Sequence, residues 1–226
     1  MSNYVSMTAG LTAFEALPDG APKAGIILIQ EVFGVNANIQ ALARQYAQAG
    51  YQVVAPDLFW RSEPGLQLDP GKAEDRSRAM QLNQAFDDEL GLTDLAACAG
   101  YLKRTLGTQA KVFALGYCMG GRLSFLLAQR GAVDAAVSYY GVNIDQYLSP
   151  ADQGAPRLIH LAEKDSLCSA DAQQRILAWA AQTEGVEAYV YADAPHAFAR
   201  EHSPAFLREA ALLANQRTRQ FLDGLS

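Results

Sequence analysis

A cysteine at the centre of a glycine-rich turn is the residue of this chain best suited to chemistry. The segment 116–121, Gly-Tyr-Cys-Met-Gly-Gly, follows a short apolar run, 112–115, and precedes an amphipathic run, 122–130. A strand followed by the pattern G-x-C-x-G-G and then by a helix is typical of a nucleophile elbow, with Cys118 in the place of the usual serine. Glycines are needed because side chains two residues away would crowd the strained turn. A glycine-rich turn around a buried structural cysteine is the alternative.

Three histidines are candidates for the base that a nucleophilic thiol requires. His196 lies in a loop directly after the last expected strand, near the sheet edge where α/β folds place their chemistry. His160 lies within the apolar segment 158–161, which favours a core position. His202 precedes Ser-Pro at an expected helix start, which favours a solvated surface position. We therefore expect His196 to be the base.

A carboxylate must orient the histidine, and Asp165 is the best placed. It follows an expected strand, on a loop at the same edge of the sheet. Asp193 competes, but it lies so close to His196 in the chain that we expect it to shape the turn. Glu163 is interpreted as a solvated neighbour. The order Cys118, Asp165, His196 matches the nucleophile, acid and histidine order of α/β hydrolases.

An oxyanion hole needs two N–H donors directed at the developing negative charge. The N–H of Met119 follows the nucleophile directly, and the start of a helix presents free N–H groups. The second donor is expected in the loop after the apolar strand 26–29, where Val32 is the candidate. Glu31 in that loop is a carboxylate beside a buried strand end, so it should be paired or bind something. A plain surface glutamate is the alternative.

Composition limits the classes to which the chain can belong. A chain of 226 residues with 50% hydrophobic content can bury a substantial core, and we expect one domain over 1–226. A net charge of −6 argues against nucleic acid or an anionic membrane as partner. Three widely spaced cysteines indicate neither a disulfide framework nor a zinc site, and fit a reducing compartment. No signal peptide is visible in 1–10 and no apolar stretch has transmembrane length, so we expect a cytoplasmic protein, by default a monomer.

Alternating strand and helix patterns predict an α/β fold, with a mostly parallel twisted sheet and helices on both faces. The expected elements besides the strand and helix around Cys118 are two short strands within 5–16, strands over 24–29, 51–55, 135–140, 157–162 and 187–191, and helices over 36–49, 72–86, 88–106, 169–183 and 203–222. Segment 59–71 is expected to be an irregular loop, and Ser169 an N-cap. Part of the segment 72–88 is expected to cover the carboxyl edge of the sheet as a cap.

These motifs together resemble the dienelactone hydrolase family, the carboxymethylenebutenolidases of the α/β-hydrolase fold. The resemblance covers nearly the whole chain and is carried by four stretches in the family's order and spacing: Gln-Glu-Val-Phe-Gly-Val-Asn at 30–36, Ala-Pro-Asp-Leu at 55–58, the cysteine turn at 116–121, and Asp165 followed by His-Ala-Phe-Ala-Arg at 196–200. It implies a triad of Cys118, His196 and Asp165.

The resemblance also implies roles for residues outside the triad. Glu31 would contact Cys118 in the resting enzyme and hold the thiol protonated until substrate binds, which would protect it because the thiolate is the reactive form. Arg76 and Arg200 would bind a substrate carboxylate, a task that suits guanidinium groups. For each arginine a solvated charge is the alternative, and Arg78 lies two residues from Arg76.

The pocket departs from the family pattern at three positions. Well-known members carry a tyrosine and a tryptophan in the cap helix where this chain aligns Met80 and Asn83, and commonly a serine after the histidine, where Ala197 stands. With Phe33 and Phe198, these are the expected substrate-contacting positions. Lost aromatic groups and a lost hydroxyl would each change binding by about 1 kcal/mol. The reaction type is therefore better specified than the substrate.

The expected reaction is hydrolysis of an enol-lactone or related activated ester bearing a carboxylate, of the dienelactone to maleylacetate type found in aromatic catabolism. The mechanism requires no metal or organic cofactor, and the turn at 116–121 does not fit a phosphate-binding loop. One alternative is a carboxylesterase or lactonase of the same fold with a different substrate. Another is a non-catalytic binding or redox-sensing protein that uses Cys118. Cys98 and Cys168 are interpreted as packing residues.

Overall fold

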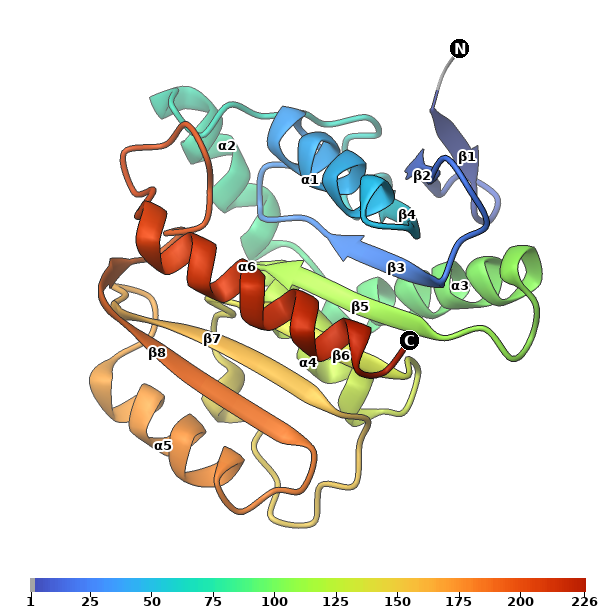
Figure 1. The fold of residues 1–226 in the computed structure, drawn as a ribbon. Coiled ribbons are helices and arrows are strands. Elements are labelled where there is room, and N and C mark those ends of the chain that lie inside the picture. The colour runs from blue at the N-terminus through green and yellow to red at the C-terminus, as the bar shows by residue number, and fades with distance from the viewer. Residues whose placement is uncertain (1–2) are drawn as a thin grey trace. The chain divides into compact units, whose positions relative to one another are not determined.

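The computed structural model of the chain describes residues 3–226, which fall into two compact units, one ending at Ala114 and the other comprising Leu115–Ser226. Both units combine strands with helices in alternation along the chain, as predicted (Figure 1). Among the described residues, no helix has both the length and the apolar character needed to cross a bilayer.

The first unit contains a mixed sheet with the strand order β1-β2-β4-β3. The strands β1 (Tyr4–Ser6) and β2 (Thr12–Ala16) form the predicted hairpin, and β2 also pairs antiparallel with β4 (Tyr51–Pro56). The strand β3 (Ala24–Ile29) runs parallel to β4 and is buried along its whole length. A continuous apolar run is what a strand covered on both faces requires.

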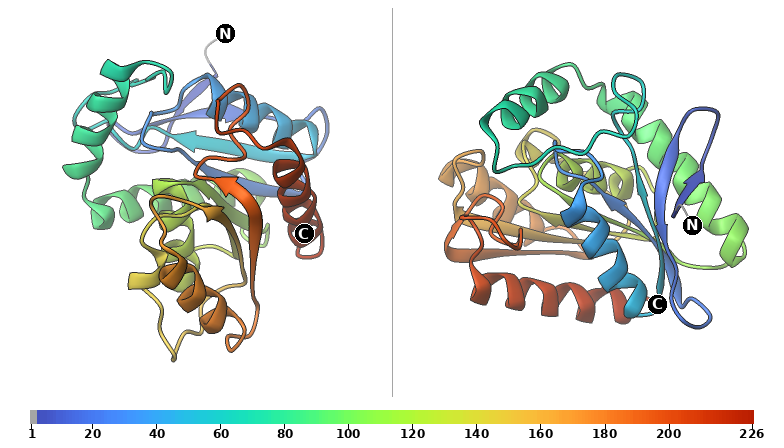
Figure 2. Two further views of the ribbon diagram at one scale, coloured as in Figure 1. Left: turned by 90° about the vertical axis from the view of Figure 1, so that its left-hand side faces the viewer. Right: turned by 90° about the horizontal axis from the view of Figure 1, so that it is seen from above.

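Three helices accompany these strands. Helix α1 (Ala37–Gln48) begins at its cap Asn36, whose side chain accepts a hydrogen bond from the Ile39 N–H at 3.3 Å. Helix α3 (Asp88–Leu106) packs against β3 and β4 on the face opposite α1 (Figure 2). Helix α2 (Ala73–Gln84) lies further out, because its apolar residues are few and only Ala79 and Leu82 are buried.

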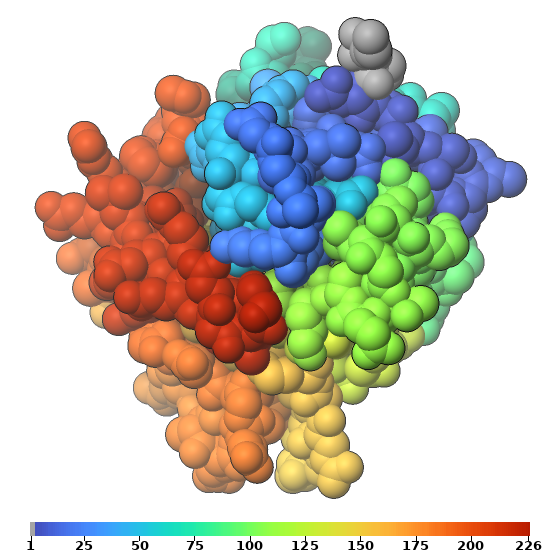
Figure 3. Space-filling view, turned by 45° about the vertical axis from the view of Figure 1, so that its right-hand side comes forward, coloured from blue at the N-terminus to red at the C-terminus, as the bar shows by residue number. Residues whose placement is uncertain are grey.

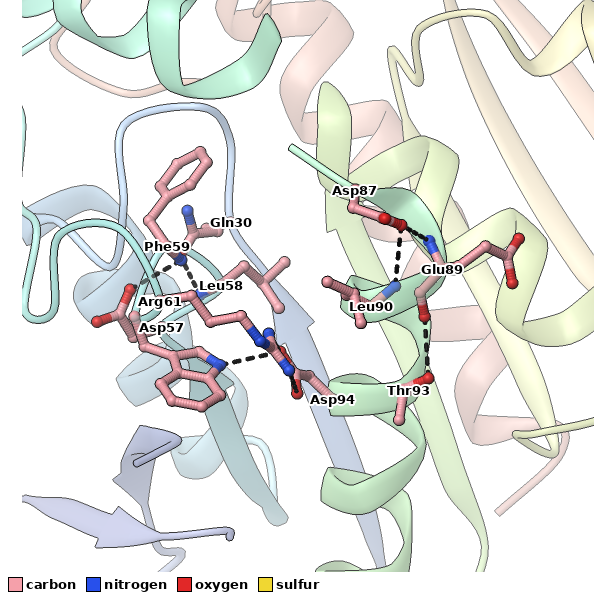
Figure 4. A network of polar contacts seen from close by, with 11 residues as sticks. Gln30, Asp57, Leu58, Phe59, Arg61, Asp87, Glu89, Leu90, Thr93 and Asp94 are labelled. Atoms are coloured by element: carbon pink, nitrogen blue, oxygen red, sulfur yellow. Dashed lines mark hydrogen bonds and ion pairs between the residues drawn. The ribbon is translucent and has the colours of Figure 1, made fainter. Parts of the chain in front are cut away.

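The irregular loop after β4 is fixed to α3 by a buried carboxylate. Asp94 of α3 is 5% exposed and accepts hydrogen bonds from the Trp60 indole at 3.0 Å and from the Arg61 guanidinium at 2.5 and 3.0 Å (Figure 4). A charged pair at this depth is stabilising only when its polar atoms are hydrogen-bonded, as they are here. The predicted loop is therefore irregular in secondary structure but held in place.

The second unit contains parallel strands, and the chain enters it within β5 (Val112–Tyr117). The remaining elements are β6 (Ala135–Tyr139), β7 (Arg157–Lys164), β8 (Val186–Pro195), a short 3-10 helix (Ile144–Gln146), and the helices α4 (Met119–Gln129), α5 (Ala170–Ala180) and α6 (Arg208–Asp223). The strand β7 pairs parallel with both β6 and β8. Helices α5 and α6 lie on opposite faces of β7 and β8 (Figure 2), and α6 forms part of the molecular surface (Figure 3).

The terminal helix begins later than the sequence predicts. The expected start at 203 is wrong, because the segment 203–207 forms a turn and α6 begins at Arg208. The Leu207 N–H donates to the Phe198 carbonyl at 2.9 Å, and the Phe206 N–H donates to the Ser203 carbonyl at 3.0 Å. Ser-Pro is typical of a helix start, but here a hydrogen bond to a distant segment decides the conformation.

Several strand limits also differ from expectation, and β7 ends at Lys164 rather than at 162. The strand β8 continues to Pro195, four residues beyond the predicted 191, and Tyr140 lies outside β6 with a left-handed φ of 39°. The predicted helix cap Ser169 is confirmed, since its Oγ accepts a hydrogen bond from the Ala172 N–H at 3.2 Å.

Candidate functional site

Cys118 occupies a strained turn between β5 and α4. Its backbone has φ 56° and ψ −116°, a conformation that L-residues rarely adopt. The turn is held on both sides: the Cys118 N–H donates to the Tyr139 carbonyl at 3.0 Å, and the Cys118 carbonyl accepts from the N–H groups of Gly121 and Arg122 at 3.0 and 3.3 Å. Strain of this kind persists only where surrounding contacts hold it. The structure therefore has the backbone geometry of a nucleophile elbow.

The glycines around Cys118 are required sterically. A Cβ on Gly116 would overlap the backbone of α4 at Gly120, and a Cβ on Gly121 would lie 2.8 Å from the Gly141 Cα. Backbone atoms at these distances cannot move aside as flexible side chains can. The predicted reason is confirmed for Gly116, which lies two residues before Cys118, and Gly121, three residues after Cys118, is constrained in the same way.

His196 follows β8 directly, and its ring is hydrogen-bonded to Asp165. The His196 Nδ1 and Asp165 Oδ2 atoms are 2.8 Å apart, and the second carboxylate oxygen, Oδ1, accepts from the Leu167 N–H at 2.8 Å. Asp165 follows β7, and the parallel pairing of β7 with β8 brings the two loops together. With both its oxygens engaged, the buried carboxylate has a fixed orientation.

Electrostatics favours the protonated form of His196. Burial would lower the pKa of the imidazole, but the hydrogen bond to Asp165 and the neighbouring Cys118 sulfur together raise that pKa above its ordinary value. The Nε2 atom of His196 is buried and has no hydrogen-bond partner within residues 3–226. Cys118 is thus close enough to His196 to influence its charge.

Tyr140 is a neighbour of the histidine that the sequence analysis did not identify. Its ring packs edge-on against the His196 ring with 5.1 Å between centroids, and against the Phe198 ring at 5.5 Å. Ala197 is buried and has a φ of 65°. The Tyr-Tyr-Gly sequence at the end of an expected strand carried a signal, because the glycine marks a tight turn.

The other two histidines lie where the sequence predicts. His160 is fully buried in β7, with its two ring nitrogens 2.8 Å from the Tyr191 hydroxyl and 2.9 Å from the Thr218 hydroxyl. Burial and the nearby Arg217 lower the pKa of His160 to about 3. His202 is exposed. His160 is therefore a neutral core residue.

The competing carboxylates lie on the surface. Asp193 belongs to β8, has a φ of 57° and forms an exposed ion pair with Lys164. The Glu163 carboxylate is exposed and accepts from the Asp193 N–H at 2.8 Å. The prediction that Asp193 shapes the turn is wrong in detail, since Asp193 lies within the strand and forms a side-chain contact to β7.

The remaining thiols are poor nucleophiles. Cys98 and Cys168 are buried and free, and burial raises their pKa values to about 12 and about 11, with the carboxylates of Asp94 and Asp165 respectively adding to the shift. The prediction that they are packing residues is confirmed. Within residues 3–226, no cluster of three or more histidine, cysteine or acidic side chains is arranged to hold a metal ion.

Several of the predicted site residues belong to the first unit. Glu31, Val32 and Phe33 are buried in the turn after β3, at 1%, 7% and 8% exposure. The Arg76 guanidinium donates through Nη1 to the carbonyls of Pro70 and Gly71 at 2.9 and 3.0 Å, which fixes it to the preceding loop.

Three further residues of α2 complete this group. Arg78 is paired with Glu63, and Met80 is 58% exposed. The Asn83 Oδ1 atom is buried without a hydrogen-bond partner in the described part of the chain.

In the second unit, Arg200 follows the histidine turn, and its N–H donates to the Ala197 carbonyl at 2.9 Å.

Comparison with known proteins gives consistent results. The model of the dienelactone hydrolase family matches residues 11–226. The carboxymethylenebutenolidases of Pseudomonas putida and Pseudomonas knackmussii are each 38% identical to the chain over 223 residues, covering 98% of the chain and 94% of each relative.

Solved structures give the same fold. A crystal structure from Klebsiella pneumoniae, of a protein whose name assigns it to the dienelactone hydrolases, matches with a TM-score of 0.80 at 29% identity, covering 93% of this chain and 92% of that one. The architecture is therefore that of the α/β hydrolases, as the sequence predicts.

Proposed function

Because the chain belongs to the dienelactone hydrolase family and is a carboxylic-ester hydrolase, we propose that it hydrolyses an enol-lactone, or a related activated ester bearing a carboxylate, through a cysteine nucleophile. One observation carries the proposal: the Asp165–His196 hydrogen bond beside Cys118, which lies in a strained strand-to-helix turn. A nucleophile, a base and a group that orients the base are the parts that acyl transfer requires.

Acylation forms the C–S bond and breaks the ester C–O bond. The Cys118 thiolate attacks the substrate carbonyl, and collapse of the tetrahedral intermediate expels the enolate. His196, protonated at this stage, is the proton source for the departing oxygen. Its raised pKa supports this role, because the Asp165 carboxylate stabilises the imidazolium.

Deacylation releases the acid and restores the thiolate. Water attacks the thioester carbonyl while the Nε2 atom of neutral His196 takes its proton, and the C–S bond breaks. The Nδ1–H stays bonded to Asp165 throughout, which keeps Nε2 available as the acceptor. The net reaction adds one water across the ester bond.

Two backbone N–H groups are proposed as the oxyanion hole. Met119 opens α4, so its N–H has no carbonyl acceptor within the helix. Val32 is assigned from its place in the turn after β3 and from the family resemblance. For Glu31, a carboxylate buried in that turn, we propose the role that the resemblance implies, holding the Cys118 thiol protonated until substrate binds.

Recognition of the substrate carboxylate is assigned chiefly to Arg200. Arg76 remains a second candidate, although its Nη1 already donates to two loop carbonyls. The proposed pocket residues are Phe33, Met80, Asn83, Ala197 and Phe198. Asn83 is the most specific of these, because its buried Oδ1 needs a donor that a substrate hydroxyl would supply.

A simple ester or lactone without a carboxylate is the second candidate substrate. The engagement of Arg76 by Pro70 and Gly71 favours it, since a guanidinium already bonded to carbonyls has fewer donors left for a carboxylate. Ala197 in place of the serine common in the family removes a further donor.

Comparing kcat/KM for a dienelactone and for p-nitrophenyl acetate tests the substrate class. We expect a strong preference for the dienelactone that Arg200→Ala lowers by about 10-fold to 100-fold, because a charged hydrogen bond contributes about 1.5–3 kcal/mol. Arg208→Ala, which removes an exposed arginine at the start of α6, is the control and should leave the preference unchanged. Equal turnover of both substrates by the unmodified enzyme would favour the simple ester.

Replacing the nucleophile tests the reaction type. Cys118→Ala should abolish turnover while the thermal midpoint stays within a few degrees, since most of the core lies elsewhere. Hydrolysis that persists in this variant would rule out the cysteine mechanism.

A further inference from the structure

Gln30 is a fully buried polar side chain that the reaction described above does not use. It follows β3 directly and lies beside Leu58 (Figure 4), and its amide forms hydrogen bonds at both ends. Its Oε1 accepts from the Leu58 N–H at 3.3 Å, and its Nε2 donates to the Glu31 carbonyl at 3.2 Å. An N–H at one end and a carbonyl at the other leave only one way to orient the amide.

The hydrogen bond from Gln30 to the Glu31 carbonyl restrains the whole peptide group between Glu31 and Val32. The carbonyl of Glu31 and the N–H of Val32 belong to the same peptide group, which is planar and trans. Holding the oxygen in place therefore fixes the direction in which the Val32 N–H points. That N–H donates to no acceptor within residues 3–226, so it is available to a ligand.

The group that holds Gln30 is itself rigid. Asp57 precedes Leu58, and its carboxylate accepts from the Phe59 N–H at 3.1 Å and from the Gly65 N–H at 2.6 Å. The Asp57 N–H donates to the Thr12 carbonyl of β2 at 3.0 Å. The glutamine thus connects the peptide after Glu31 to a turn that is anchored in the sheet of the first unit.

We propose that Gln30 is a positioning residue for the oxyanion hole: its amide bridge between Leu58 and the Glu31 carbonyl fixes the Glu31–Val32 peptide, and with it the direction of the Val32 N–H, the donor that the proposed function assigns to the oxyanion. The inference rests on the proposed function, which assigns that N–H its role. Glutamine is required because the bridge needs one acceptor and one donor on the same side chain. A methionine offers neither, and an ionised glutamate offers only acceptors.

Gln30→Met tests the bridge with a side chain of similar length. We expect kcat to fall by about 10-fold to 100-fold, somewhat less than complete loss of one oxyanion donor, which costs about 100-fold to 1,000-fold. KM should change by less than about threefold, because the lost interaction strengthens only in the transition state. Alkylation of Cys118 by iodoacetamide should keep its rate within about twofold, since attack on that carbon develops no oxyanion.

Gln30→Glu supplies a pH-dependent version of the same test. A protonated carboxyl group keeps both hydrogen bonds, whereas an ionised one loses the donor. The kcat of this variant relative to the unmodified enzyme should therefore fall as pH rises between about 5 and about 9, the range in which a buried glutamate titrates. Gln30→Met should show a loss that does not vary with pH.

Gln52→Met is the matched control. Gln52 is a buried glutamine of β4 whose Nε2 donates to the Glu15 carboxylate at 2.8 Å, and it lies opposite Gly25, at the other end of β3 from Gln30. Its replacement should lower the thermal midpoint by a similar amount without lowering kcat. A general loss of packing would instead lower kcat in both glutamine variants alike.

The two proposals fail in different ways. The positioning role alone is overturned if Cys118→Ala loses activity while folded Gln30→Met keeps an unchanged kcat. It is also overturned if the kcat ratio of Gln30→Glu to the unmodified enzyme does not vary with pH. A parallel fall in the Cys118 alkylation rate also overturns it, because the thiol itself would then be affected. Full hydrolysis in Cys118→Ala overturns the proposed function.

Discussion

Replacing Asp165 by asparagine removes the charge that orients the histidine while keeping the shape of the side chain. One carboxylate oxygen accepts from the Leu167 N–H at 2.8 Å and the other is bonded to the His196 Nδ1 at 2.8 Å. Asparagine must offer its oxygen to the Leu167 N–H, because its amide nitrogen cannot accept. Its NH2 group then faces Nδ1, so the ring proton moves to Nε2, the atom that has to accept a proton from water.

The expected loss follows from these two bonds. Losing a charge-assisted hydrogen bond costs about 1.5–3 kcal/mol, which at its upper end is about 150-fold in rate. The wrong tautomer adds to this, and the corresponding substitution in a serine-protease triad lowers kcat by about 10⁴-fold. We therefore expect Asp165→Asn to lower kcat by between about 100-fold and about 10⁴-fold.

Stopped-flow kinetics with p-nitrophenyl acetate separates acylation from deacylation, and the thermal midpoint reports on folding. Asp193→Asn is the matched control, since Asp193 is an exposed carboxylate three residues before His196 and forms an ion pair with Lys164. We expect kcat in this control to change by less than about threefold, because exposed ion pairs contribute little. A loss below tenfold in Asp165→Asn, or a larger loss in Asp193→Asn, would refute the reasoning.

Three further perturbations have expected outcomes of their own. Gly116→Ala should destabilise the fold by about 3 kcal/mol or more in urea unfolding, because its Cβ overlaps backbone, whereas Gly20→Ala, which meets nothing within 4 Å, should be nearly neutral; equal effects would contradict this. Buried His160 has a folded pKa below its unfolded value, so its contribution to stability is present above about pH 6.5 and is lost as pH falls. The free energy of unfolding should therefore decrease by about 2 kcal/mol by pH 5. In His160→Gln this pH-dependent loss should be absent. Carbamidomethylation of Cys118 takes away the contribution of the sulfur to the raised pKa of His196, so that pKa should fall in an NMR titration. An unchanged pKa would show that the sulfur does not act on the ring.

Much of the architecture could be predicted from local sequence. Strands such as β3 are continuous apolar runs, and helices such as α5 begin at a capping serine, so pattern and position agree. The meeting of Asp165 with His196 could also be expected, because loops that follow neighbouring parallel strands lie at one edge of a sheet. Local chemistry and simple sheet geometry were sufficient for these features.

Other features depend on contacts between distant segments. The turn before α6 is held by the carbonyl of Phe198, and no local signal in Ser-Pro indicates that bond. The left-handed backbone of Tyr140 and its edge-on contact with His196 require the loops after β6 and β8 to be close in space. The amide bridge of Gln30 likewise needs the N–H of Leu58. Such features are set by tertiary structure, and no periodic pattern in the sequence indicates them.

The proposed thioester on Cys118 is tested most directly by rapid-quench mass spectrometry with p-nitrophenyl acetate. We expect a burst of p-nitrophenol to coincide with one acetyl group per chain on the peptide that contains Cys118, followed by its loss at the rate of turnover. Steady hydrolysis without an acetyl group on Cys118, or with the acetyl group on another residue, would contradict the cysteine mechanism.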